Sequence, residues 1–390
     1  MKILFVSQLY PPLVYGGGEY IFSKWAEELV KKGHKVTVIT QNLKGSPKNE
    51  KINGVNVLRV GPKIEYKGSL YAINTFQNFG FLLSAMKKII LIRKKFDIIH
   101  ANTYIPALSA WMANFFLRKP LLFTVHDVYL QDRKDFWKQW AKQKEVPKIV
   151  SLVGGLLEKI ILKLPRTMIH TVSKTSEEDI IKTGVKKQRI VVIPNGLNLT
   201  EYDKIKSPKN KKNQIYFVGR LIFYKNIDTV IKSMKLILKK VPNTKFIISG
   251  KGPYEDKLKE IVKQEGLEKN IIFTGRVSDE QKIKYLKESD IMVQPSLVEG
   301  FGITIIESFA CKTPVISSNV MPLPELVKDG INGYVCKPFD EKEWAEKIAL
   351  LLKDKNKIRK LGDNARKIVE ENYTIQVIVK KLERLYNRLL

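Results

Sequence analysis

Short apolar runs alternate with longer amphipathic segments along the first half of the chain. The amphipathic segments predict helices over residues 21–32 and 79–95, the first of which is closed by Gly33. The apolar runs predict buried strands over residues 3–6, 36–39, 98–100, 121–125 and 168–172. Strands that alternate with helices favour a parallel sheet with helices on both faces.

The same alternation restarts in the second half. Residues 198–213 are rich in Lys and Asn and have little apolar periodicity, so we interpret them as an interdomain linker. The pattern beyond them predicts strands over residues 215–218, 245–249, 271–273, 291–294 and 315–317, and helices over residues 226–240, 254–265, 279–288 and 302–310. We therefore predict an α/β fold with two Rossmann-like parallel-sheet domains, residues 1–197 and 214–374, that face a central cleft. A length of 390 residues suits two such cores.

Charge narrows the range of partners. Lys and Arg outnumber Asp and Glu by 69 to 39, which gives a formal net charge of +30 and favours nucleic acid, anionic membranes or phosphorylated substrates. Basic and aromatic residues are not interleaved as in a recognisable RNA-binding module, so we expect no nucleic-acid partner. Cys311 and Cys336 form no metal or redox spacing, and no apolar run is long enough to span a membrane. These features favour a cytoplasmic protein.

The strongest candidate site lies between Ser296 and Glu307. A Gly-rich turn follows a predicted strand there and leads into a predicted helix, an arrangement whose free N–H groups bind anions. Glu299 precedes the helix and Glu307 lies about one turn inside it, so both carboxylates can face one cleft. A carboxylate can accept two hydrogen bonds from a diol, which suits a hydroxyl-rich ligand. The alternative is a loop that carries two solvated glutamates.

Two cations follow the first strand of the second domain. Arg220 and Lys225 lie at a strand end beside a helix start, where a guanidinium fork and a point charge suit a diphosphate. A surface basic pair explains them equally well in so basic a chain. Gly250-Lys251-Gly252-Pro253 follows another strand and is typical either of a close approach to ligand or of a tight turn without one.

The first domain offers a glycine loop and a histidine. Gly16, Gly17 and Gly18 lie between the first strand and first helix but lack the dinucleotide-binding spacing. His126 and Asp127 follow a strand, where a histidine serves either a site or the fold. No zinc spacing, P-loop or D-x-D motif occurs, so we expect neither a metal nor a cofactor.

Taken in order, these motifs resemble glycosyltransferase family 4, whose members are retaining enzymes of the two-Rossmann GT-B architecture. The resemblance covers nearly the whole chain and also includes Pro11-Pro12, Pro194-Asn195-Gly196 and Gly275-Arg276-Val277. It implies a hexosyltransferase that moves sugar from a UDP-, GDP- or ADP-sugar, as substrate, to a glycan or lipid-linked acceptor in cell-envelope synthesis. It also implies that a C-terminal helix, residues 375–390, packs back on the first domain.

The resemblance assigns a role to each matching residue. His126, Arg220, Lys225 and Glu299 are the catalytic residues it implies, with His126 beside the sugar and the two cations on the leaving diphosphate. The donor contacts it implies are Gly16 and Gly17 to diphosphate and sugar, Val277 to the base, Glu299 to hydroxyl groups of the transferred sugar, the backbone of Phe301, Gly302 and Ile303 near the sugar and phosphate, and Glu307 to the ribose.

Two alternatives keep the sequence pattern but change the function. A sugar-nucleotide epimerase has a similar two-domain architecture and would release sugar without an acceptor. A basic nucleic-acid-binding protein is compatible with the charge alone.

Residues 133–144 bear on the acceptor. Phe136, Trp137 and Trp140 fall on one side at helical spacing and lysines fall elsewhere, as in a helix that lies in a membrane interface. The basic segment 87–95 would add attraction to anionic lipid, which would place the protein peripherally at the inner face of the membrane. The alternative is that the aromatic side chains pack on the core of the first domain.

Overall fold

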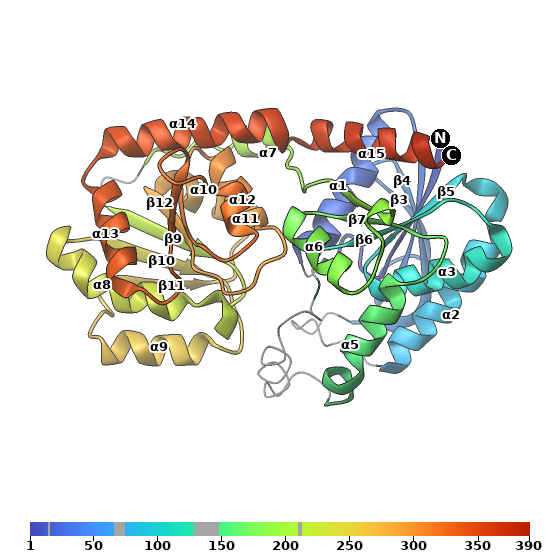
Figure 1. Ribbon diagram of the computed structural model, residues 1–390, viewed down its shortest axis with the longest axis horizontal. Coiled ribbons are helices and arrows are strands. Elements are labelled where there is room, and N and C mark those ends of the chain that lie inside the picture. Colours follow the sequence, from blue (N-terminus) through green and yellow to red (C-terminus); the bar gives the residue numbers. More distant parts are fainter. Residues whose placement is uncertain (15, 66–74, 127, 129–147, 210–212) are drawn as a thin grey trace. The chain divides into compact units, whose positions relative to one another are not determined.

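The computed structural model describes all of the chain except residues 15, 66–74, 127, 129–147 and 210–212 (Figure 1). It divides into two compact units. The first comprises residues 1–195 together with 375–390, and the second comprises residues 196–374. The predicted α/β class with two Rossmann-like sheets is confirmed, and each unit is described separately below.

The first unit is built on an eight-stranded sheet in the order β3-β4-β2-β1-β5-β6-β7-β8. Its strands are β1 (Lys2–Ser7), β2 (Lys35–Leu43), β3 (Asn49–Ile52), β4 (Val55–Ile64), β5 (Ile98–Asn102), β6 (Leu121–Val125), β7 (Met168–Thr171) and β8 (Ile190–Val192). All neighbours are parallel except β3 and β4, which pair antiparallel at one edge. The sheet is therefore mixed, whereas the sequence pattern predicts a parallel one. Because most residues of β3 are polar, no apolar run in the sequence predicts this strand.

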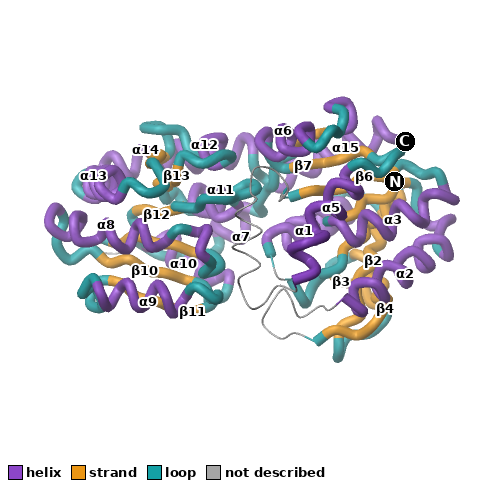
Figure 2. Tube along the Cα trace, turned by 60° about the horizontal axis from the view of Figure 1, so that its bottom comes forward, coloured by secondary structure: helices purple, strands orange, loops and turns teal. Residues whose placement is uncertain are grey.

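Helices cover this sheet and bury its apolar strands (Figure 2). They are α1 (Gly17–Lys31), α2 (Thr75–Leu91), α3 (Tyr104–Leu117), α5 (Lys148–Leu162), α6 (Lys174–Lys182), α15 (Ile375–Leu389), and the short 3-10 helices η2 (Arg93–Lys95) and η3 (Lys187–Arg189). One core cluster joins α2, α3 and α5 to the sheet, for example through Phe81, Ala110, Ile161 and Phe123. These three helices thus share one layer.

The second unit has a six-stranded parallel sheet in the order β11-β10-β9-β12-β13-β14. The strands are β9 (Gln214–Val218), β10 (Lys245–Ser249), β11 (Ile271–Gly275), β12 (Ile291–Gln294), β13 (Val315–Ser318) and β14 (Gly333–Cys336). The helices are α7 (Leu199–Asp203), η4 (Phe223–Lys225), α8 (Ile227–Lys240), α9 (Glu255–Gln264), α10 (Asp279–Glu288), α11 (Ile303–Ala310), α12 (Leu323–Leu326), α13 (Glu341–Leu352) and α14 (Lys355–Asn372).

The segment expected as a linker is partly structured. Asn198 caps α7 by accepting a hydrogen bond from the Thr200 backbone, and Tyr202 is buried with its hydroxyl on Glu307. Arg366 binds both carboxylate oxygens of Asp203 at 2.9 Å. Residues 199–203 therefore belong to the second unit. A five-residue helix carries too few apolar positions to show a period, which is why the pattern misses it.

The helix α15 is bound to the first unit through buried polar groups. The Tyr386 hydroxyl donates to His100 Nδ1 at 2.6 Å, and His100 Nε2 donates to Thr124 Oγ1 at 2.5 Å. Thr124 in turn donates to His170 Nδ1 at 2.9 Å, and His170 Nε2 donates to the Ile193 carbonyl at 2.8 Å. The carbonyl can only accept, and this fixes the direction of the whole chain of bonds when both histidines are neutral.

Candidate active site

In parallel sheets, ligands bind beyond the carboxyl ends of the strands, and the candidate residues of both units follow strand ends. In the second unit these residues follow β9, β11 and β12. In the first unit they follow β1 and β6.

Backbone hydrogen bonds join the loops that follow β9, β10 and β11. The Gly219 amide donates to the Ser249 carbonyl at 3.0 Å, and the Gly250 amide donates to the Gly275 carbonyl at 2.8 Å. A Cβ on Gly250 would lie 1.8 Å from the Gly219 carbonyl oxygen, and one on Gly252 would lie 2.2 Å from that of Leu221. Both glycines are thus required by loop packing, which explains the Gly250–Gly252 motif without a ligand.

These joined loops place two of the predicted donor residues. Arg220 is exposed at the end of β9, directly after Gly219. Val277 is half-buried between β11 and α10, one residue before Ser278, whose hydroxyl caps α10 by accepting from the Gln281 amide at 3.2 Å. Arg220 and Val277 therefore follow β9 and β11, the two strands that flank β10, and their loops are joined through the loop after β10.

Side chains from two other elements hold Glu299. Lys225 Nζ lies 2.6 Å from Glu299 Oε2, and the Gln294 amide donates to the same oxygen at 2.9 Å. Thr304, on α11, donates to the Gln294 carbonyl oxygen at 3.1 Å, which fixes the orientation of the amide. Lys225 and Glu299 are largely buried, at 12% and 18% exposed side chain. The structure therefore brings together two residues that the sequence pattern treats separately.

Asn226 fixes the loop that carries Lys225. This residue adopts a left-handed conformation with φ of 52° and is buried. Its side-chain amide donates to the carbonyls of Pro295 at 3.2 Å and Pro338 at 2.7 Å. The Leu297 amide also donates to the Tyr224 carbonyl at 2.8 Å. The η4 loop and the loop after β12 are thereby fixed as one piece.

Glu307 is the fifth residue of α11 and its side chain is only 5% exposed. Lys282 Nζ lies 2.7 Å from Glu307 Oε1, and the Tyr202 hydroxyl donates to the same oxygen at 3.0 Å. Burial alone would lower the pKa of Lys282, but the carboxylates of Glu307 and Asp279 outweigh it and raise that pKa. Lys282 thus stays charged and leaves Glu307 Oε2 as the second acceptor.

The start of α11 is shaped by Gly302. This N-cap residue has φ of +97°, a conformation that favours glycine, and a Cβ there would lie 3.1 Å from Ile305 Cδ1. No side chain caps the helix at Gly302. Phe301 is buried with its ring centroid 6.0 Å from that of Tyr373, and Ile303 opens the helix. Backbone N–H groups at such a helix start can bind an anion.

In the first unit, His126 packs directly on a glycine. A Cβ on Gly18 would lie 2.8 Å from His126 Cδ2 and 2.9 Å from Nε2. His126 Nε2 lies 2.9 Å from Asn102 Oδ1 and donates to it. Burial, with a smaller contribution from His170, lowers the pKa of His126 well below its usual range. His126 is therefore neutral, and its Nδ1 is an acceptor.

The other two glycines lie just before that contact. Gly16 is the N-cap of α1, Gly17 begins the helix, and both are exposed. The Gly16 amide donates to the Glu19 carboxylate at 3.1 Å. Gly18 is therefore the glycine that the histidine requires, and Gly16 and Gly17 are the exposed pair.

The sequence pattern does not predict four residues that hold the candidate site together. Lys282, Tyr202 and Gln294 lie outside the motifs, and nothing distinguishes Lys282 among 69 basic residues. Asn102 ends the buried strand β5, so the signal that points to His126, a polar residue at a strand end, could also have pointed to it. Asp127 and the aromatic segment 133–144 lie outside the described residues. Within the described part of the chain, no group of three His, Cys, Asp or Glu side chains is placed to hold a metal.

The chain has two α/β units, and carboxylates and cations follow the strand ends of the second unit. This combination is typical of a GT-B glycosyltransferase. A family model described as Glycosyltransferase Family 4 matches residues 15–201, and one described as Glycosyl transferases group 1 matches residues 199–368. An uncharacterized glycosyltransferase of Methanocaldococcus jannaschii is 30% identical over 401 aligned positions, which cover 99% of this chain and 98% of that protein. The chain therefore belongs to glycosyltransferase family 4, and it is a hexosyltransferase, as the resemblance implies.

Two further proteins resemble the chain. The capsular polysaccharide biosynthesis glycosyltransferase CapM of Staphylococcus aureus is 30% identical over 331 positions, covering 80% of this chain and 82% of CapM. The structure of Anabaena HepE in complex with UDP-glucose superimposes with a TM-score of 0.76 at 19% identity and covers all of both chains. At that identity the HepE likeness establishes the fold. Among the helices that the structure describes, none is both long and apolar enough to cross a bilayer.

Proposed function

We propose that the protein transfers a hexosyl group from a nucleotide-diphosphate sugar to a glycan or lipid-linked acceptor and retains the anomeric configuration. One observation carries the proposal: Glu299 and Glu307 are each held by a lysine from another element, Lys225 at 2.6 Å and Lys282 at 2.7 Å. Carboxylates fixed in this way are preorganised acceptors for the hydroxyl groups of a nucleotide sugar.

The donor residues divide by chemistry. Glu307 Oε2 accepts from the ribose hydroxyls, and Glu299 accepts from hydroxyl groups of the transferred sugar. The backbone at Phe301, Gly302 and Ile303 lies near the sugar and phosphate. Val277 contacts the base through its backbone. Gly16 and Gly17 give the diphosphate and sugar a close approach on the first unit. HepE has been solved with UDP-glucose, which supports a UDP-sugar as the first donor to test, with GDP- and ADP-sugars as the alternatives.

Charge stabilisation is the main catalytic contribution in this proposal. Arg220 and Lys225 neutralise the negative charge that grows on the diphosphate as it leaves, without a metal ion. His126 is neutral and accepts a hydrogen bond from the sugar at Nδ1, so it positions the sugar rather than supplying a proton. A mechanism in which the acceptor attacks the face that the diphosphate leaves needs no dedicated carboxylate base, which agrees with retention.

The relatives support a chemical class of acceptor. CapM is named for capsular polysaccharide biosynthesis, which supports a cell-envelope glycan or its lipid-linked precursor. We place the reaction in the cytoplasm, where nucleotide sugars are made available to the enzyme.

Thermal unfolding with UDP-, GDP- and ADP-sugars tests the donor. A donor at 100 times its dissociation constant should stabilise the protein by about 2.7 kcal/mol. Proton NMR of the transferred sugar then reads the anomeric configuration, and activity should persist in excess EDTA. An inverted product would refute retention, loss of activity on chelation would refute metal independence, and no stabilisation by any nucleotide sugar would refute the donor assignment.

A further inference from the structure

The solvent-facing side of α2 is apolar along its length. Phe76, Phe79, Leu83 and Leu91 recur at helical spacing with exposed fractions of 75%, 60%, 39% and 65%. Lys87 fills the remaining position of this stripe. The opposite side, with Phe81, Ala85 and Ile89, is fully buried in the core. A helix that packs on a core on one side only should carry polar residues on the other, so a second apolar side indicates a second contact.

The two neighbouring helices add to this surface. Phe115 and Phe116 are exposed at the end of α3, and Leu156, Leu157 and Ile160 are exposed on α5. The helices α2, α3 and α5 lie side by side on one layer of the first unit (Figures 1 and 2). In the second unit, the exposed large apolar residues lie on separate elements: Ile272, Met321, Ile331, Phe339 and Leu350. We call the exposed side chains of α2, α3 and α5, together with those of the short segments that follow each helix, the basic–apolar face.

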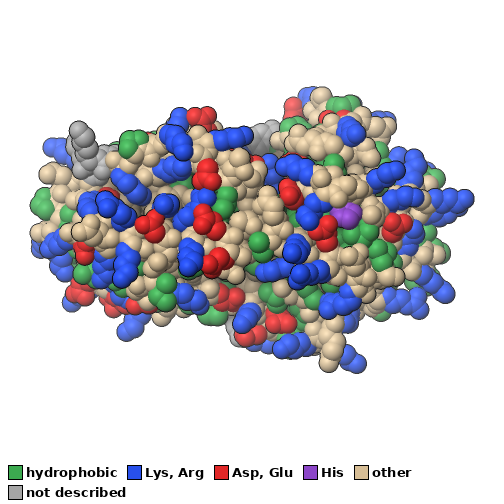
Figure 3. Space-filling model, turned by 90° about the horizontal axis from the view of Figure 1, so that it is seen from above, with side chains coloured by type: hydrophobic (Ala, Val, Ile, Leu, Met, Phe, Trp, Pro, Cys, Tyr) green, Lys and Arg blue, Asp and Glu red, His purple; other side chains and the backbone are tan. Residues whose placement is uncertain are grey.

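The charges on this face have one sign. Residues 75–97, 104–120 and 155–167 contain Lys87, Lys88, Arg93, Lys94, Lys95, Arg118, Lys119, Lys159, Lys163 and Arg166. Their acids are Asp97, which accepts from the Lys2 amide at 2.8 Å, and Glu158, which is buried and bonded to Tyr104. The face of the molecule shown in Figure 3, by contrast, carries both red and blue side chains. The basic–apolar face therefore fits an anionic partner.

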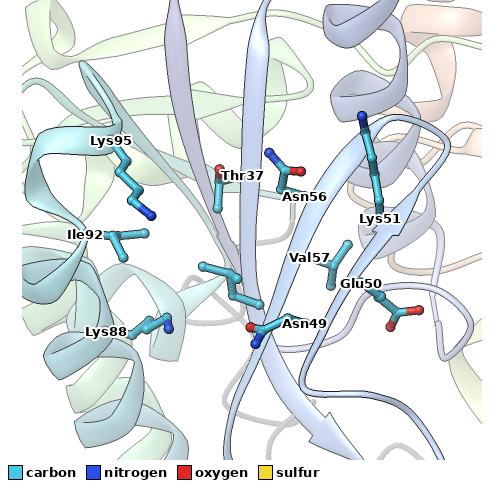
Figure 4. Close-up of a pocket in the computed structure, with 10 residues that line it drawn as sticks. Thr37, Asn49, Glu50, Lys51, Asn56, Val57, Lys88, Ile92 and Lys95 are labelled. Carbon is cyan, nitrogen blue, oxygen red and sulfur yellow. The ribbon is translucent and has the colours of Figure 1, made fainter.

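A hollow of about 560 Å³ opens beside the C-terminal end of α2. Lys88 and Lys95 line it from the helical side, and Thr37, Asn49 and Asn56 line it from the strands (Figure 4). Glu50, also at its wall, is 2.7 Å from Arg59 and is neutralised by it. The hollow, which Lys51 also lines, thus offers three ammonium groups and neutral hydrogen-bonding side chains, a combination that suits a phosphate headgroup.

We propose that the basic–apolar face binds the surface of an anionic phospholipid bilayer. The apolar side chains of α2, α3 and α5 enter the boundary between headgroups and acyl chains, and the lysines and arginines are attracted to the anionic headgroups. The hollow beside Lys88 and Lys95 receives a lipid phosphate. A bilayer fits better than a protein partner because, among the described residues of these three helices, apolar and basic groups are interspersed and the acid among them, Glu158, is buried. The inference is independent of the donor chemistry proposed above.

Vesicle co-sedimentation tests the proposal. Wild type is mixed with vesicles of phosphatidylglycerol and phosphatidylcholine, and with vesicles of phosphatidylcholine alone. Binding should require phosphatidylglycerol and weaken as salt rises, because salt screens the attraction. Lys87→Gln with Lys94→Gln should weaken binding roughly 25-fold, about fivefold for each lysine. Phe76→Ser with Phe79→Ser should weaken it by roughly tenfold or more.

Matched variants in the second unit serve as controls. Phe339→Ser removes an aromatic side chain of similar exposure, 69%, and Lys239→Gln with Lys240→Gln removes two exposed lysines of α8. Both controls should bind vesicles as wild type does. Donor-induced thermal stabilisation should be unchanged in every variant, which separates this proposal from the donor site.

Three outcomes would overturn the assignment. Equal binding of the α2 variants and controls would place the lipid contact elsewhere. Equal binding to both kinds of vesicle would remove the electrostatic part of the proposal. Self-association in solution that is abolished by Phe76→Ser with Phe79→Ser would assign the face to a second copy of the chain.

Discussion

Lys282 and Tyr202 converge on one oxygen of Glu307, Oε1, from 2.7 and 3.0 Å, and leave Oε2 for another partner. Glu307→Ala should therefore lower donor affinity, since each lost hydrogen bond to a charged group is worth about 1.5–3 kcal/mol, or roughly 10–150-fold. The measurement is calorimetric titration with the nucleotide sugar that stabilises wild type. An unchanged dissociation constant would remove Glu307 from the donor site.

The same substitution also strands a buried cation, so its effect on folding must be separated. Breaking a buried ion pair from one side costs about 3–5 kcal/mol. The double variant Lys282→Met with Glu307→Gln leaves no buried unpaired charge, since Asp279, the other partner of Lys282, is exposed. It should recover most of that stability while donor affinity stays low. If affinity recovers together with stability, the role of Glu307 is structural.

Arg220 and Lys225 should act mainly on turnover. Alanine at either position removes charge that opposes the developing negative charge on the diphosphate, so kcat should fall more than the donor KM rises. Steady-state kinetics over a range of donor concentrations gives both constants. Lys259→Ala, on the exposed side of α9, is a suitable control and should leave both unchanged. A change in KM alone would limit the two cations to ground-state binding.

Substitution of Gly18 distinguishes the effect of helix propensity from the effect of side-chain packing. Alanine is favoured over glycine inside a helix by up to about 1 kcal/mol, so Gly18→Ala in α1 should be stabilising if the site were open. The ring of His126 would instead lie 2.8 Å from the new Cβ and must move. We expect lower kcat with little gain in thermal stability, read by activity assays and thermal unfolding. A stabilised variant with full activity would contradict the packed geometry.

Three buried histidines should make stability depend on pH. Burial lowers the pKa of His170 to about 4 and lowers the pKa values of His100 and His126 below 6.5. Below about pH 6.5 the unfolded chain binds protons that the folded chain does not, so stability should fall as pH falls. Each histidine contributes up to about 1.4 kcal/mol per pH unit until its folded pKa is reached.

Denaturant unfolding at pH 7.5, 6.0 and 5.0 measures this slope. His170→Gln should make it shallower by removing one of the titrating groups. A free energy of unfolding that is flat from pH 7.5 to 5.0 would mean that the histidines are accessible to protons in the folded protein.

Much of the fold could be predicted because its strands are buried on both faces. The strands at 245–249 and 291–294 coincide with β10 and β12, since apolar runs mark them. The helix at 279–288 coincides with α10, whose buried residues Ile283 and Leu286 recur at helical spacing. The hairpin of β3 and β4 could not be predicted in this way, because Asn49–Ile52 is a polar edge strand whose partner supplies the apolar side chains. Pairing between strands is a tertiary property that a local pattern does not contain.

The candidate site was predictable only in part, for a similar reason. The positions of Glu299 and Glu307 follow from a local motif, and the structure places both at the expected turn and helix. Their partners Lys225 and Lys282 lie 74 and 25 residues away, and a lysine alone gives no sign of the carboxylate it will contact. Gly250 and Gly252 show the converse, since a motif suggestive of ligand is accounted for by the close packing of two loops.

The bond between Tyr386 and His100 has a consequence for the order of synthesis. The hydroxyl that completes the buried chain of hydrogen bonds belongs to α15, which emerges from the ribosome after the whole second unit. Until then His100 Nδ1 lacks its donor, and Lys32 and His34, just after α1, lack Glu383 of α15 as their partner. The second unit is continuous in sequence and can therefore finish folding first. The first unit, although synthesised earlier, keeps an uncovered face until α15 has been made. A chain stalled on the ribosome before residue 375 therefore contains an incompletely folded first unit.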